Sequence, residues 1–92
     1  MLKREIHERV ALFKLLSDPN RYQCIAFLMR AKAGESVGSI AEELDMSHSS
    51  VSHLLSGLYE SSVVAYKKQG REVLYSIAKT PQAKRVAKLM KA

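Results

Sequence analysis

The spacing of the apolar residues changes at about residue 63 of this 92-residue chain. Before that point apolar side chains recur every three or four residues, which is the period of an α-helix. Two runs rich in β-branched and aromatic residues then follow, at 63–68 and 72–77, and Gln69-Gly70-Arg71 separates them. Such a pair predicts a β-hairpin with Gly70 at positive φ. A helical spacing returns after Thr80, so the chain is expected to be mainly α with one small hairpin.

Helix-start signals divide the helical part into five predicted helices. Asp18-Pro19 is typical of a helix start, because Asp caps the first turn and Pro suits the first helical position. Ser36 and Ser47 are expected to cap a third and a fourth helix, and Thr80-Pro81 begins the last. The predicted helices cover 3–16, 19–32, 36–44, 48–60 and 80–92. On the second helix we expect four side chains to face the core: Tyr22, Ile25, Ala26 and Met29.

The third and fourth predicted helices form a helix-turn-helix unit over 36–60, and the hairpin at 63–78 follows it as a wing. One face of the fourth helix is apolar. The opposite face carries only hydroxyl and imidazole side chains, at His48, Ser49, Ser52, His53 and Ser56. Such side chains allow a helix to enter a major groove closely and to hydrogen-bond base edges or phosphates. The alternative is an ordinary solvated face, although such faces more often carry Glu and Lys.

The basic residues lie toward the two ends of the chain. The net charge of +6 divides into +4 for 1–33, −5 for 34–65 and +7 for 66–92. A basic chain indicates a polyanionic partner, yet the helix-turn-helix contains no Lys or Arg. Phosphate contacts are therefore expected from Arg21 and from the wing, where the alternative is a hairpin kept basic for solubility. The complete predicted DNA-binding set is Arg21, Ser47, His48, Ser49, Ser52, His53, Ser56, Lys67, Lys68 and Arg71.

Four stretches together resemble the ArsR/SmtB family of winged-helix repressors. They are LSDPNR at 16–21, SVGSIAEEL at 36–44, MSHSSVSHL at 46–54 and GREVLYSI at 70–77. The resemblance covers about residues 9–78 in unbroken order. It implies a cytoplasmic prokaryotic homodimer that binds double-stranded operator DNA through the fourth helix and the wing. It also implies release from DNA by a metal or another signal.

The same resemblance places the dimer interface on the first and last helices, 1–16 and 80–92, of a single domain covering 1–92. The apolar stripes of both helices would be exposed in a small monomer, and a two-fold axis between two copies would bury them. The stripes contain Ile6, Val10, Phe13, Ala83, Val86, Ala87 and Met90. A symmetric dimer would place its fourth helices about 34–36 Å apart and would read an inverted repeat.

The chain departs from the family where metals would bind. The thiolate pair of the third helix would fall at Ser36 and Gly38, and residues 73–92 contain no His, Cys, Asp or Glu. We therefore expect neither metal site and no cofactor, and the effector or regulatory partner is left open. The one cysteine, Cys24, is expected to be a small buried residue or, if exposed beside Arg21, a redox-sensing thiol. The family usually has Gly where Ser62 stands, so Ser62 is expected to be left-handed.

Two other classes of function compete with a transcriptional repressor. The cation-free fourth helix and the acidic middle favour a winged-helix protein-interaction dimer with weak or no specific DNA binding. An enzyme is not expected, because residues 47–56 hold no Asp or Glu to orient a histidine. No apolar run reaches the ~18–20 residues of a membrane span. The charged amino terminus does not suit a signal peptide, so a cytoplasmic protein is expected.

Overall fold

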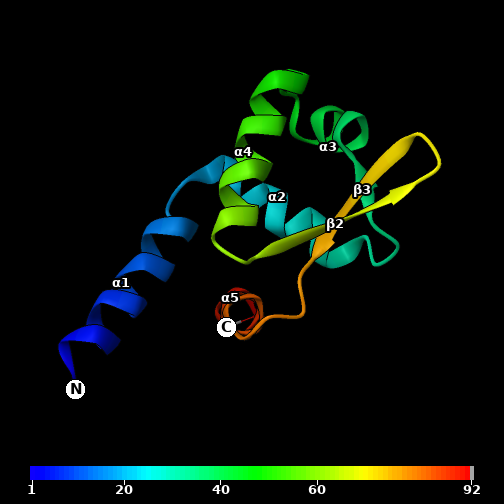
Figure 1. The fold of residues 1–92 in the computed structure, drawn as a ribbon. Coiled ribbons are helices and arrows are strands. Elements are labelled where there is room, and N and C mark those ends of the chain that lie inside the picture. Colours follow the sequence, from blue (N-terminus) through cyan, green and yellow to red (C-terminus); the bar gives the residue numbers. More distant parts are fainter. Residues whose placement is uncertain (92) are drawn as a thin grey trace.

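The computed structural model describes residues 1–91 and contains five helices and three strands. In chain order they are α1 (Lys3–Leu16), α2 (Pro19–Arg30), β1 (Glu35–Ser36), α3 (Val37–Leu44), α4 (His48–Glu60), β2 (Val64–Gln69), β3 (Glu72–Ile77) and α5 (Pro81–Met90). Figure 1 shows α1 extending away from the rest, with α3, α4 and the hairpin together at the other side and α5 below them. The predicted order of helices, turn and wing is confirmed; the part of the last predicted helix at Ala92 lies outside the described residues.

The helix starts follow from local side-chain chemistry. Each of four residues accepts a hydrogen bond on its side-chain oxygen from the backbone N–H three positions later: Asp18, Ser36, Ser47 and Thr80. These caps satisfy donors that the first helical turn leaves free. After α4, Ser62 adopts the predicted left-handed conformation, with φ of 63°. The turn between α3 and α4 contains another such residue, Asp45, with φ of 55°.

The sheet has one strand more than the sequence predicted. Its order is β1-β3-β2, and all pairs are antiparallel. The added strand, β1, pairs Glu35 with Tyr75 and Ser36 with Leu74, so it links the start of α3 to the wing. At the wing tip Gln69 pairs with Glu72, which leaves a turn of two residues. Gly70 takes the first turn position with φ of 66°, where an L side chain would be strained.

The core lies between α2, α3, α4, α5 and the base of β2, and α1 adds Leu12 to it. On α4 the side chains of Val51, Leu55 and Leu58 are fully buried, as their spacing predicted. The prediction for α2 was wrong in part, because Tyr22 is 43% exposed. Ile25 is fully buried as predicted, and Cys24 and Leu28 are buried beside it in place of Tyr22.

The two terminal helices differ in how much apolar surface they leave free. On α1, Ile6, Val10 and Phe13 are exposed, as predicted. The expectation that Ala83 and Val86 would be exposed in one chain was wrong, because each is 1% exposed. Both face an interior gap that α2 and the wing also line, so α5 packs on its own chain. The remaining predicted α5 positions, Ala87 and Met90, are half-buried, and Leu89 is exposed.

Within residues 1–91, no helix combines the length and the apolar character that crossing a membrane requires.

Candidate nucleic-acid interface

The outer face of α4 is polar and open to solvent. Burial of Val51, Leu55 and Leu58 fixes one side of the helix against the core. Because side chains three and four positions apart share a helix face, the opposite side must face outward. All five predicted groove-facing residues are exposed there: His48, Ser49, Ser52, His53 and Ser56. None of the five is Lys, Arg, Asp or Glu, so this face offers hydroxyl and imidazole groups rather than lysine or arginine side chains.

The hydroxyl of Ser47 is occupied by capping. It accepts the backbone N–H of Ser50 at 3.1 Å, donates to the Ser50 hydroxyl at 2.8 Å and lies 3.2 Å from the Ser49 hydroxyl. Three hydroxyls are therefore held together at the start of α4. Ser47 therefore caps α4 as well as being exposed to solvent. Sequence analysis had not placed Ser50 in the site, although the run of adjacent serines was a visible signal.

The two histidines of α4 face different neighbours. A Cβ added at Gly38 would meet His48 Cε1 at 3.5 Å and Nε2 at 3.7 Å, so this ring lies over the start of α3. His53 instead lines a groove on the side of α2. The two imidazoles therefore lie toward different neighbours, although both belong to the exposed polar face of α4.

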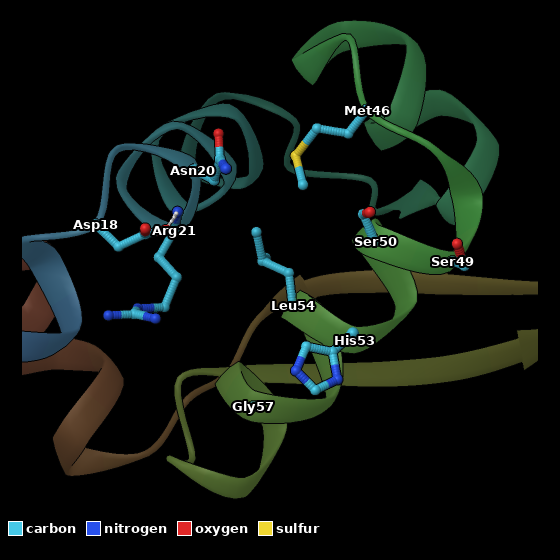
Figure 2. A pocket seen from close by; sticks show the side chains of 9 residues that line it. All are labelled: Asp18, Asn20, Arg21, Met46, Ser49, Ser50, His53, Leu54 and Gly57. Carbon is cyan, nitrogen blue, oxygen red and sulfur yellow. Dashed lines mark hydrogen bonds between the residues drawn. The ribbon is translucent and has the colours of Figure 1, made fainter.

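A groove of about 490 Å³ separates α4 from the start of α2 (Figure 2). Two of the predicted DNA-binding residues on α4, Ser49 and His53, line it together with Arg21. Asn20 and Gly57 also line the groove but were not among the predicted site residues. The sequence of either helix alone does not indicate that α2 packs beside α4. The full lining is Asp18, Asn20, Arg21, Met46, Ser49, Ser50, His53, Leu54 and Gly57.

The guanidinium of Arg21 is bound to the end of α1. Its Nε donates to the carbonyl of Leu15 at 2.8 Å and its Nη2 donates to that of Lys14 at 3.0 Å. These carbonyls carry partial negative charge because the helix ends there. Figure 2 shows the side chain directed away from His53. In this structure the guanidinium of Arg21 therefore joins α1 to α2, and its contact with phosphate stays a prediction.

The cations of the wing have no such partner. Lys67, Lys68 and Arg71 are all exposed. Among residues 1–91, one ion pair lies within 4.0 Å, that of Arg30 with Glu43, and it does not involve the wing. Side chains alternate between the two faces of a strand, so Lys67 and Lys68 point to opposite faces of β2. The wing thus presents positive charge at its tip and on both sides.

Three tyrosines join α4 to the wing. Tyr66 and Tyr75 are cross-strand partners, and their ring centroids lie 5.7 Å apart with the ring planes tilted by 48°. Tyr59 from α4 lies with its centroid 5.2 Å from that of Tyr66. Tyr59 had no predicted role, because nothing within α4 indicates which strand lies beside its last turn.

Cys24 lies in the core and not at the surface. Its side chain is fully buried, and burial raises the pKa of the thiol from 9.0 to about 11. Because the thiolate is the reactive form, the redox-sensing alternative is not supported. Arg21 also directs its charge elsewhere. Within the described part of the chain, no group of three or more His, Cys, Asp or Glu side chains is arranged to hold a metal ion.

The fold is that of several solved regulators. HlyU from Vibrio cholerae N16961, in its reduced form, matches with a TM-score of 0.80 and 24% identity, covering 97% of this chain and 92% of HlyU. The antimony-specific transcriptional repressor AntR matches with a TM-score of 0.83 and 24% identity, covering 98% of this chain and 77% of AntR. At this identity the likeness establishes the winged-helix fold.

Sequence comparison gives the family. The transcriptional repressor SdpR of Bacillus subtilis (strain 168) is 34% identical over 70 residues, which are 75% of this chain and 74% of SdpR. A transcriptional repressor SmtB homolog of Synechocystis sp. (strain ATCC 27184 / PCC 6803 / Kazusa) is 32% identical over 74 residues, which are 80% of this chain and 54% of that protein. The family model described as "Bacterial regulatory protein, arsR family" matches residues 18–66. The chain therefore belongs to the arsR family of bacterial regulatory proteins, and the predicted winged-helix DNA-binding transcriptional regulator is confirmed.

Proposed function

We propose that this regulator represses transcription by binding an inverted repeat of double-stranded DNA as a homodimer, with α4 in the major groove and the wing beside it. The observation that carries the proposal is the exposed, cation-free Ser/His face of α4 next to a wing with three unpaired cations. Sequence is read by groups that reach base edges, and phosphate contacts set position. The structure supplies these two kinds of group on two neighbouring elements.

The side chains of α4 fit close approach to base edges. Ser49, Ser52 and Ser56 are short and can donate or accept a hydrogen bond, and His53 adds a longer imidazole. Without Arg or Lys, α4 has no bidentate contact to guanine, which is the commonest specific contact. We expect discrimination to come from serine and histidine hydrogen bonds together with DNA shape, read by Arg71 at the wing tip.

Dimerisation is proposed through a groove between α1 and α5 of about 630 Å³. Phe13 is 60% exposed and Leu89 is 37% exposed at this groove. Glu5, Glu8 and Arg9 line its α1 wall, and Arg85 and Lys88 line its α5 wall. A second copy related by a two-fold axis would cover these apolar side chains. The free stripe of α1, at Ile6 and Val10, is available to the same partner.

Such a dimer would act in the cytoplasm, where the operator lies. The proposal includes no catalytic step.

Fluorescence anisotropy with the DNA upstream of the gene tests the proposal, with a scrambled duplex as control. The variant Ser52→Glu places a carboxylate on the exposed Ser/His face of α4, which we propose enters the major groove of DNA. Ser52 is exposed, so the core is not changed. We expect it to weaken operator binding at least about tenfold, because like charges face each other at the phosphates. The matched control Gln23→Glu adds the same charge at an exposed site of α2.

Three results would decide the matter. Submicromolar binding that scrambling abolishes, lost in Ser52→Glu and kept in Gln23→Glu, supports the proposal. An equal loss in both variants would show that only net charge matters. Equally weak binding of the wild type to both duplexes would contradict the assignment of this upstream DNA and would favour the protein-interaction dimer.

A further inference from the structure

The tyrosine ladder of Tyr59, Tyr66 and Tyr75 spans the two elements that the proposed function assigns to DNA. Tyr59 belongs to the last turns of α4, and the other two face each other across the hairpin. The ring planes meet at 51° for Tyr59 with Tyr66 and at 48° for Tyr66 with Tyr75. Tilted pairs at these distances are favourable beyond the area that they bury. Tyr59 and Tyr66 are nevertheless about half exposed, at 50% and 51%, so burial alone does not account for their placement.

The outer part of the wing has little other support on this side. Beyond Tyr66 the chain from 67 to 72 is exposed throughout. On the far edge of β3, β1 pairs with Leu74 and Tyr75 and so ties the wing to α3. Tyr66 and Tyr75 lie directly opposite each other, so their rings share one face of the hairpin, and the ring of Tyr59 packs against that of Tyr66. The wing is therefore held to both helices of the helix-turn-helix, by backbone pairing at the edge of β3 and by aromatic rings on one face.

We propose that Tyr59 is a positioning residue that fixes the wing relative to α4, so that Lys67, Lys68 and Arg71 meet the DNA while α4 occupies the major groove. This inference rests on the proposed function. When the wing is already held at a fixed position relative to α4, it has less conformational freedom to lose on binding DNA. The entropic cost of binding is therefore smaller. Tyr59 thus acts through the wing cations, and its own contact with DNA is not required.

A double-mutant cycle tests this directly. The first change is Tyr59→Ala; the second is the wing triple Lys67→Ala, Lys68→Ala and Arg71→Ala. We expect Tyr59→Ala to weaken operator binding about fivefold in the wild type but less than about twofold in the triple variant, because coupled sites are not additive. Tyr59→Phe retains the ring and should bind like the wild type. Tyr22→Ala, an exposed tyrosine on α2, is the control.

Limited digestion with trypsin gives a second measurement that needs no DNA. In Tyr59→Ala, cleavage at Lys67, Lys68 and Arg71 should accelerate relative to cleavage at Arg85 in α5, while Tyr59→Phe and Tyr22→Ala should not change this ratio. An equal effect of Tyr59→Ala in both DNA-binding backgrounds would overturn the proposal. So would a loss in Tyr59→Phe as large as in Tyr59→Ala, or an unchanged cleavage ratio. Failure of the wild type to bind its operator would instead count against the proposed function, and the digestion would still decide the role of Tyr59.

Discussion

Replacing Arg71 by alanine removes a cation from the tip of the wing without removing any side-chain hydrogen bond or ion pair found among residues 1–91. Arg71 is exposed and follows Gly70 in a two-residue turn. Its guanidinium takes no part in the one ion pair found among residues 1–91, that of Arg30 with Glu43. The fold should therefore be unchanged. If Arg71 neutralises one phosphate in each protomer of a dimer, the slope of log K against log salt concentration should become shallower by about 1.8.

This change in slope has a measurable consequence. Between about 50 and 200 mM salt, operator affinity should fall about 12-fold more for the wild type than for Arg71→Ala. Anisotropy titrations at four salt concentrations measure both slopes. The matched control is Arg30→Ala, which removes the same side chain from the end of α2, where it pairs with Glu43 at 3.7 Å. A slope in Arg71→Ala equal to that of the wild type and of Arg30→Ala would refute the phosphate contact.

Four further changes have defined outcomes. Arg21→Met should lower the free energy of unfolding by about 1–3 kcal/mol, measured in urea, because two hydrogen bonds from a charged donor are lost; an unchanged midpoint would contradict this structural role. Leu55→Ala should cost about 2–5 kcal/mol, because Leu55 is fully buried; a cost below about 1 kcal/mol would place Leu55 outside the core. Burial raises the pKa of the Cys24 thiol from 9.0 to about 11. As the pH rises, the unfolded chain therefore loses the thiol proton before the folded chain does. The free energy of unfolding should fall as the pH rises from 9.0 to about 11. Cys24→Ala should remove that part of the pH dependence seen in thermal melts; an identical pH profile would mean that another group causes it. Phe13→Glu should shift the protein toward monomers in sedimentation analysis, and an unchanged dimer would exclude the α1–α5 groove.

Local signals in the sequence were sufficient for the helices and for the hairpin. Asp18, Ser36, Ser47 and Thr80 each cap the helix that follows them, because a cap depends on residues three positions apart. The outward face of α4 followed from the spacing of its apolar side. Strand β1 could not be predicted in this way, since Glu35–Ser36 is only two residues long and its partners, Tyr75 and Leu74, come 40 and 38 positions later.

The errors in the predicted site have a common physical origin. An apolar stripe shows that a helix buries one face but not which surface covers it. Ala83 and Val86 were therefore assigned to a partner although α5 packs on its own chain. A cationic side chain likewise does not reveal its acceptor. Arg21 was expected at phosphates, and nothing in its own helix indicated that it would also donate to the carbonyls at the end of α1. Tyr59 could be assigned only once β2 was placed beside α4.

Selection of bound duplexes from a random library, followed by the stoichiometry of the best binder, tests the account most directly. The account predicts an inverted repeat with half-site centres about 10–10.5 base pairs apart, or a multiple of this spacing, bound by two protomers. Ser52→Glu should fail to recover the same sequence. Recovery of no preferred sequence, or of a single half-site bound equally well by one protomer, would contradict the proposal that a dimer reads DNA with the Ser/His face of α4.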